Sequence, residues 1–283
     1  MIERRSICQG GGGWDTKAGL EEPVPKSPAG PVSLSDARAL PGLRLVVIQG
    51  VPSPWSQAAK AILRVKGIDY TLVHRLPSDP KGALEEWTGQ SSFPAAMYED
   101  ERPRTGWAEI LLLAERLAPA PPLVPSDPEQ RAFFFGLCHE VCGEMGLGWC
   151  RRLESVSAGL ARTPPDPIAV WLGNKYGHSP ETAALAPGRV RDVLGLLAEL
   201  LAASQARGGR FLLGAELGAL DLYWATFCNL IAPLPPAQLS LPDAMRPIFV
   251  HPDPAIHELL EKTGLLAHRD RIYEQFLELP VVL

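Results

Sequence analysis

The residues best placed to do chemistry are the hydroxyl of Ser53 and the helix start beside it. An apolar segment at 45–48 has the composition of a buried strand, and a helical pattern follows at 57–66. Ser53 is a preferred N-cap residue, Pro54 suits the first helical position, and the backbone N–H of Ser56 is within reach of the Ser53 hydroxyl. Since a helix N-terminus favours negative charge, this hydroxyl could help to hold a thiolate or another small anion. The alternative is that Ser53 only caps the helix.

Cysteine residues offer a second kind of chemistry, either metal binding or redox exchange. The chain has five cysteines, an odd number without regular spacing, which is typical of reduced thiols in a cytoplasm. Cys138 and Cys142 are four residues apart and share one face of a predicted helix, with Cys150 nearby. His139 lies on another face, and no second cysteine pair follows at zinc-finger spacing. We therefore expect buried free thiols and no metal site.

The composition is typical of a globular protein and argues against several classes of function. Of its 283 residues, 46% are hydrophobic and 21% are charged, and the formal net charge is −5. This charge argues against nucleic acid as the main partner. The sequence contains no run of about 18 apolar residues, so no membrane partner is expected, and its N-terminus lacks the apolar core of a secretory signal. These features predict a cytoplasmic protein.

Prolines, glycines and periodic apolar residues divide the chain into four parts. Residues 1–42 contain four consecutive glycines and several prolines, and they are expected to form a disordered or linker-like tail. Residues 43–119 are expected to form an α/β unit with strands at 43–49, 69–74 and 95–98 and helices at 54–66, 82–87 and 107–117. A linker follows at 120–127, and its Ser126 opens a capping-box pattern. Residues 128–283 are expected to be helical, with segments at 190–203, 220–230, 257–266 and 270–277.

This order of elements, together with four motifs, resembles the glutathione transferase superfamily over about residues 43–280. The motifs are Ser53-Pro54-Trp55-Ser56, Phe93-Pro94, the proline-rich segment at 125–132, and Phe211-Leu212-Leu213-Gly214 followed by Leu220-Asp221-Leu222. The resemblance implies an α/β plus all-α fold, in which a thioredoxin-like β-α-β-α-β-β-α domain precedes a helical bundle. It also implies a cis bond between Phe93 and Pro94. Gly218 stands where the family usually has a capping Ser or Thr, so Asp221 is left to favour the first turn of that helix.

The resemblance further implies a glutathione-dependent reaction. Ser53 would be the catalytic residue, because a donated hydrogen bond and a helix N-terminus favour the thiolate of glutathione over its thiol, whose ordinary pKa is about 8.5. The glutathione-binding residues would be Trp55, Ser56, Phe93, Pro94, Thr105 and Trp107. A small hydrophobic electrophile would be accepted by Val51, His139, Cys142, Trp149 and Trp171. Family members are commonly two-fold dimers, so a homodimer is expected.

One family motif is missing from the start of the helix at 107–117. Family members usually carry Glu, Gln or Asp followed by Ser there, to hold the γ-glutamyl end of glutathione, but this chain has Gly106 and Trp107. Each lost charge-assisted hydrogen bond costs about 1.5–3 kcal/mol, which Arg104 or Thr105 nearby could offset. Two hypotheses stay open. The chain is either a transferase that activates the glutathione thiol, or a transferase-like binding protein with an altered glutathione site and little thiol chemistry.

Overall fold

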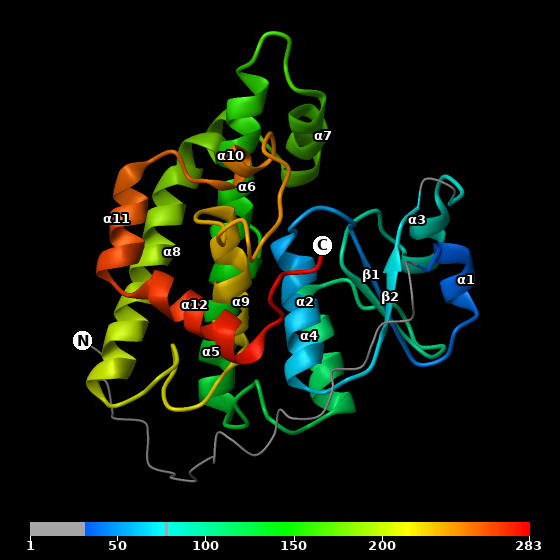
Figure 1. Cartoon of the computed structure of the whole chain (residues 1–283), viewed down its shortest axis with the longest axis horizontal. Coiled ribbons are helices and arrows are strands. Elements are labelled where there is room, and N and C mark those ends of the chain that lie inside the picture. The colour runs from blue at the N-terminus through cyan, green and yellow to red at the C-terminus, as the bar shows by residue number, and fades with distance from the viewer. Residues whose placement is uncertain (1–31, 77–78) are drawn as a thin grey trace.

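A small sheet with helices on both faces leads into a larger helical unit (Figure 1). The computed structural model describes residues 32–76 and 79–283. In chain order the first unit consists of α1 (Leu34–Arg38), β1 (Leu43–Val47), α2 (Pro54–Val65), β2 (Thr71–His74), α3 (Ala83–Thr88), β3 (Ala95–Tyr98) and α4 (Trp107–Leu117). The strand order is β2-β1-β3, with β2 parallel and β3 antiparallel to β1. The parallel β-α-β arrangement predicted for 43–74 is thereby confirmed.

The second strand of the predicted β-β-α segment is reduced to a single bridge. Ala96 and Arg104 exchange two backbone hydrogen bonds, of 2.8 and 2.9 Å, outside any named strand. Pro103 precedes Arg104 and has no N–H with which to continue a ladder. The bridge still holds the start of α4 beside the start of β3.

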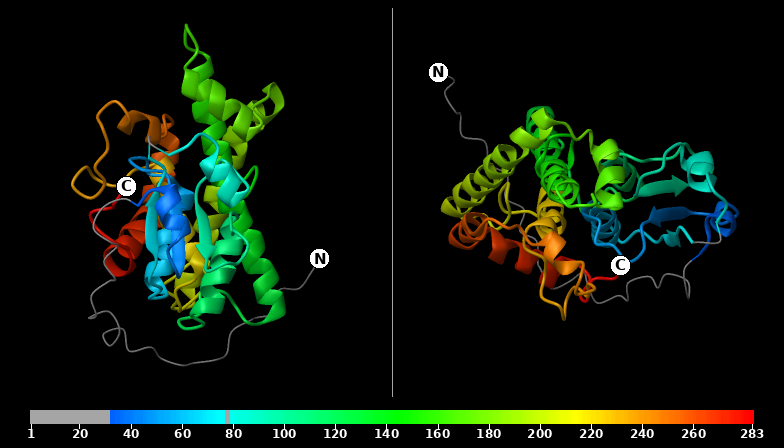
Figure 2. Two further views of the ribbon diagram at one scale, coloured as in Figure 1. Left: turned by 90° about the vertical axis from the view of Figure 1, so that its right-hand side faces the viewer. Right: turned by 90° about the horizontal axis from the view of Figure 1, so that it is seen from above.

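The tail expected over residues 1–42 does not extend that far. Ser33 caps α1 by accepting a backbone hydrogen bond of 3.1 Å, and Leu34 and Ala37 are fully buried. Both side chains pack with Val46 and Val73 on the sheet face opposite α2, so α1 and α3 lie on the outer side of the sheet (Figure 2). Two apolar residues on one short helix are enough to cover this face, but they form too short a pattern to be recognised as periodic. Residues 1–31 lie outside the described part of the chain.

The helical unit follows the segment at 118–127. It consists of α5 (Pro128–Cys142), α6 (Leu147–Leu160), α7 (Pro167–Tyr176), α8 (Pro180–Ala206), α9 (Ala219–Phe227) with its 3-10 extension η1 (Cys228–Leu230), α10 (Arg246–Phe249), α11 (Pro254–Lys262) and α12 (Leu265–Phe276). The predicted capping box is wrong in detail, because Asp127 and not Ser126 accepts the backbone N–H of Gln130 (2.9 Å). The predicted helix at 257–266 is also interrupted, because Gly264 has a φ of +74° and begins α12.

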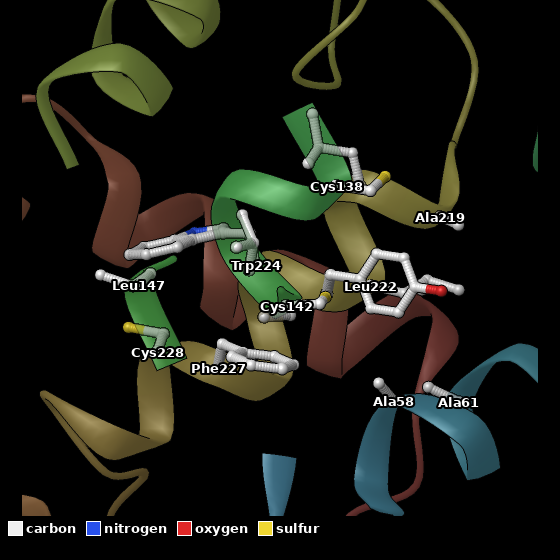
Figure 3. Packing of buried hydrophobic residues seen from close by; sticks show 14 of the residues in the cluster. Ala58, Ala61, Cys138, Cys142, Leu147, Ala219, Leu222, Trp224, Phe227 and Cys228 are labelled. Carbon is white, nitrogen blue, oxygen red and sulfur yellow. The ribbon is translucent and has the colours of Figure 1, made fainter. Parts of the chain in front are cut away.

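One hydrophobic core joins the two units. α2 and α4 lie on the inner face of the sheet, and α2 packs against α9, which in turn contacts α5 and α12. Figure 3 shows Ala58 and Ala61 of α2 facing the layer that contains Cys142 and Phe227. Small side chains on α2 allow the helices to approach closely. Cys138, Cys142 and Cys150 are buried and unpaired, as predicted. Cys228 is also buried and unpaired, and the fifth cysteine, Cys8, lies outside the described residues.

Candidate functional site

Three chain segments meet at one edge of the sheet. The parallel register pairs Val47, the last residue of β1, with His74, the last residue of β2. The antiparallel register pairs Val46 with Ala95, so Pro94 lies beside the end of β1. The loop that leads to Ser53 leaves from the same edge. In open α/β sheets, the carboxyl ends of parallel strands are the usual position of ligand sites.

Ser53 occupies the N-cap position of α2 but does not cap it through its side chain. Its backbone is extended (φ −66°, ψ 116°), and its carbonyl accepts the first helical hydrogen bond, from Gln57 N–H at 2.9 Å. The hydroxyl makes no capping hydrogen bond, so the predicted bond from Ser56 N–H is not formed. This half-buried hydroxyl is therefore not used by the helix and is left at its positively polarised end.

A cavity of about 40 Å³ lies between α2, α4, the start of β3 and α9. Five of the predicted glutathione-binding residues line it, namely Trp55, Phe93, Pro94, Thr105 and Trp107. The Phe93–Pro94 bond is cis, as the resemblance implied. This volume holds a few water molecules, whereas small-molecule sites usually measure about 300–1,000 Å³. The predicted residues are thus brought together, but around a space smaller than a tripeptide.

Both cavity tryptophans are also packing residues of the helical unit. Trp55 donates a hydrogen bond of 2.9 Å to the Cys142 carbonyl and meets Phe227 edge-on at 4.9 Å between ring centroids. Trp107 meets Tyr223 edge-on at 5.6 Å and Phe135 at 6.2 Å. These contacts give each indole a structural role, whether or not it also touches a ligand.

The carboxylate of Glu109 accepts hydrogen bonds from backbone N–H groups at the start of α4. Glu109 Oε2 accepts the backbone N–H groups of Thr105 (3.2 Å) and Gly106 (3.1 Å), and Oε1 pairs with Arg102 at 2.8 Å. Burial raises the pKa of Glu109, but the hydrogen bonds from Arg102, Gly106 and Thr105 outweigh it and lower the pKa below its usual value. Glu109 was not singled out from the sequence, although a glutamate three residues after the N-cap residue is placed to accept the N-cap N–H. A carboxylate ligand approaching these two N–H groups would have to compete with it.

Structural comparison decides the fold. No protein-family model matches the chain, and no curated protein matches it in sequence. A Tau class glutathione S-transferase from mango, Mangifera indica, is 18% identical, with 84% of this chain and 93% of that chain covered at a TM-score of 0.53. A glutathione S-transferase from Methylobacillus flagellatus, solved with glutathione bound, is 12% identical over 83% of this chain and 96% of that chain, at a TM-score of 0.57. The chain has the glutathione transferase fold. The thioredoxin-like and helical parts predicted from the sequence are thereby confirmed.

Within this transferase fold, the residues predicted to accept the electrophile do not form one pocket. Cys142 is a core residue, 2% exposed, and burial raises the pKa of its thiol well above the usual value. His139 is exposed on α5, and Val51 packs against the core from the loop before α2. Trp149 of α6 and Trp171 of α7 lie on neighbouring helices, and Trp171 is 56% exposed. None of these five residues lines the cavity described above.

Of the six residues predicted to bind glutathione, Ser56 is the one that does not line the cavity, and the predicted catalytic residue Ser53 does not line it either. The Ser56 side chain is 1% exposed, and its hydroxyl has no partner among the described residues. One position earlier, Trp55 faces the helical unit, so Ser56 is turned to another side of α2 and buried there.

Within residues 32–76 and 79–283, no helix is both long enough and apolar enough to cross a bilayer.

Proposed function

We propose that the protein is a glutathione-dependent transferase in which Ser53 activates the thiol. The observation that carries this proposal is the Ser53 hydroxyl, which lies at the N-terminus of α2 and makes no capping bond. Such a hydroxyl can donate its hydrogen bond to a bound sulfur, and the helix dipole adds to the preference for negative charge. Each unit by which the thiol pKa is lowered represents about 1.4 kcal/mol of preference for the thiolate.

In the proposed reaction the sulfur attacks a small hydrophobic electrophile. The S–H proton passes to solvent, an S–C bond forms, and the electron pair of the broken bond leaves with the displaced group or remains on the acceptor. Ser53 keeps its own proton and acts as a hydrogen-bond donor. The backbone of Phe93, beside the cavity, is proposed to hold the cysteinyl part of glutathione. The Ser at position 53 favours conjugation, thiol-dependent isomerisation or ether cleavage over disulfide exchange.

A second candidate function is a binding protein that uses the transferase fold without thiol chemistry. Two observations favour it. The Glu109 carboxylate holds the N–H groups of Thr105 and Gly106, where the γ-glutamyl end of glutathione is expected. The cavity of about 40 Å³ must also widen before a tripeptide can enter, and Trp107 is packed against α5 and α9.

Thermal melting with and without glutathione separates the two candidates. Glutathione at 100 times its dissociation constant adds about 2.7 kcal/mol, which corresponds to a rise in Tm of about 5–10 °C for a protein of this size. A rise at 10 mM glutathione supports the transferase, and no rise at that concentration contradicts it. Where binding is seen, Ser53→Ala should keep the rise and lose activity toward a model electrophile such as 1-chloro-2,4-dinitrobenzene.

The proposal includes a homodimer and a cytoplasmic location, where glutathione is abundant and cysteines stay reduced. Sedimentation velocity at micromolar concentration tests the dimer. A single species at the monomer mass would contradict it.

A further inference from the structure

The short helix α1 lies beside α3 on the outer side of the sheet (Figure 1). It precedes residue 43, where the resemblance to glutathione transferases begins. α3 has six residues, and the glycines at its two ends, Gly82 and Gly89, have φ values of +85° and +75° and offer no capping side chain. Helices this short are not stable by themselves in water, so the position of α3 depends on what it packs against.

Arg38, the last residue of α1, makes two polar contacts with α3. Its Nη1 is 2.9 Å from Glu86 Oε1, and its Nη2 donates a hydrogen bond of 3.0 Å to the Ala83 carbonyl. The guanidinium carbon is also 6.0 Å from the centre of the Trp87 ring. One side chain of α1 therefore contacts three residues of α3, including the first.

Asp79 joins the other end of α1 to the segment before α3. Its Oδ1 accepts the backbone N–H of Leu34 at 3.1 Å, and its Oδ2 accepts that of Leu76 at 2.6 Å. Leu34 is the first residue of α1, where backbone N–H groups have no partner within the helix. Both ends of α1 are thus bound to the part of the chain that contains α3.

The buried contacts of α1 extend to Phe93. Leu34 and Ala37 are fully buried, and they share one small cluster with Ala83 and Leu84 of α3. The side chain of Phe93 packs against this same cluster. Because α1 supplies two members of the cluster, it contributes to the surface on which Phe93 rests.

Hydrogen bonds also connect the end of α3 to the backbone beside Phe93. The buried Thr88 hydroxyl, at the last position of α3, is 2.9 Å from the Gln90 carbonyl. The Gln90 side-chain amide donates a hydrogen bond of 3.0 Å to the carbonyl of Ser92. A displacement of α3 would therefore loosen the backbone that leads into Phe93.

We propose that α1 is a positioning element for glutathione, in which Arg38 and Asp79 hold α3 and the segment that leads to Phe93. This rests on the proposed function, in which the Phe93 backbone holds the cysteinyl part of glutathione. A ligand that binds one arrangement of a segment binds more weakly when that arrangement is less populated. Loss of the α1 contacts therefore raises the dissociation constant of glutathione and leaves the step at Ser53 unchanged.

Hydrogen exchange of the free protein and glutathione binding test the two parts of this proposal on the full chain. Arg38→Gln and Asp79→Ala should each speed amide exchange in residues 83–94. Each should raise the glutathione dissociation constant, measured by titration calorimetry, about threefold, and the double variant about tenfold. kcat at saturating glutathione should change less than twofold. Arg191→Gln breaks a comparable ion pair, with Asp253 at 3.0 Å, and should leave the exchange and the dissociation constant unchanged.

Unchanged exchange in residues 83–94 of both single variants would overturn the proposal. Faster exchange with an unchanged dissociation constant would also overturn it, because α1 would then be only structural. Arg38 is exposed, so Arg38→Gln is expected to fold even where the double variant does not, and its threefold effect alone supports the proposal. If glutathione gives the wild type no rise in Tm, the proposed function falls and the effect on glutathione falls with it. The exchange experiment, made without glutathione, still decides whether α1 holds this segment.

Discussion

The indole nitrogen of Trp55 donates a hydrogen bond of 2.9 Å to the carbonyl oxygen of Cys142, near the C-terminus of α5. The last carbonyls of a helix have no partner within the helix, so this bond satisfies one of them with a residue from the first turn of α2. The same side chain lies against Phe227 of α9. A residue beside the candidate catalytic serine thus also joins the two units of the fold.

Replacing Trp55 should destabilise the protein in two separable steps. Trp55→Phe keeps a ring beside Phe227 but removes the N–H, and it should cost about 1 kcal/mol. Trp55→Ala also removes the ring and should cost about 3 kcal/mol. Denaturant unfolding measures both losses. A cost below 1 kcal/mol for Trp55→Ala would show that the indole does not hold the units together.

The serines at the N-cap positions of α8 and α2 should behave in opposite ways. Ser179 at the start of α8 accepts the Thr182 N–H at 3.2 Å, so Ser179→Ala should cost about 1 kcal/mol and leave transferase activity intact. Ser53 makes no such bond, so Ser53→Ala should cost less than about 0.5 kcal/mol yet abolish activity. Unfolding curves and an activity assay on both variants check this. Full activity in Ser53→Ala would leave Ser53 as only the residue at which α2 begins.

Glu109 should stabilise the protein in a pH-dependent way. Its pKa is lowered in the folded state, so the stabilisation is complete above the unfolded carboxyl pKa of about 4.3 and is lost as the pH falls through the lower folded value. At pH 7, Glu109→Ala should cost about 1 kcal/mol, and the difference from the wild type should shrink between pH 5 and pH 3. Glu199→Ala, an exposed change within α8, should show no such trend. A difference that does not depend on pH would contradict the capping role.

The segment between the two units is held by a buried ion pair. The Lys66 ammonium, whose side chain is fully buried, is 2.6 Å from Glu115 Oε1 and 2.6 Å from the Pro121 carbonyl. Glu115 also accepts the Leu123 N–H at 2.9 Å. Glu115→Gln leaves the buried ammonium without its counter-charge and should cost about 3 kcal/mol, measured by chemical denaturation.

The exposed pair between Lys262 and Glu258 is the matched control for this measurement. Glu258→Gln should cost less than about 0.5 kcal/mol, because solvent screens the pair. Similar costs at positions 115 and 258 would show that the burial of Lys66 does not govern the stability of this segment.

Local pattern was enough to predict most of the architecture. The strand at 43–47 follows from a continuous apolar run, and the helix from Pro54 follows from its Ser-Pro start and the glycine at 67. The second strand of the parallel pair follows from apolar alternation. The Asp221 prediction also agrees with the structure, since its carboxylate accepts the Gly218 N–H at 3.1 Å and the Leu212 N–H at 2.8 Å. The short helix α1 was missed, because two buried residues produce no period.

Only those residues of the candidate site could be predicted whose position follows from the order of strands and helices along the chain. Ser53, Phe93 and Pro94 could be placed, because the register of three strands brings their connections to one edge. Ser56 and Cys142 were assigned to the site but lie in the core, because the direction in which a helical side chain points depends on what the helix packs against.

The amino-acid sequence by itself determined the order of elements, the serine at a helix start and the Phe93–Pro94 step, because these depend on neighbours along the chain. Only the tertiary structure decided that the Ser53 hydroxyl makes no capping bond and that Glu109 accepts the backbone N–H of Gly106 at the start of α4. It also decided that the two tryptophans of the cavity pack between the two units. The packing of the tryptophans depends on groups that are far apart in sequence and become neighbours only when the two units pack together. The free Ser53 hydroxyl and the contacts of Glu109 depend on side-chain conformations, which a sequence pattern does not fix.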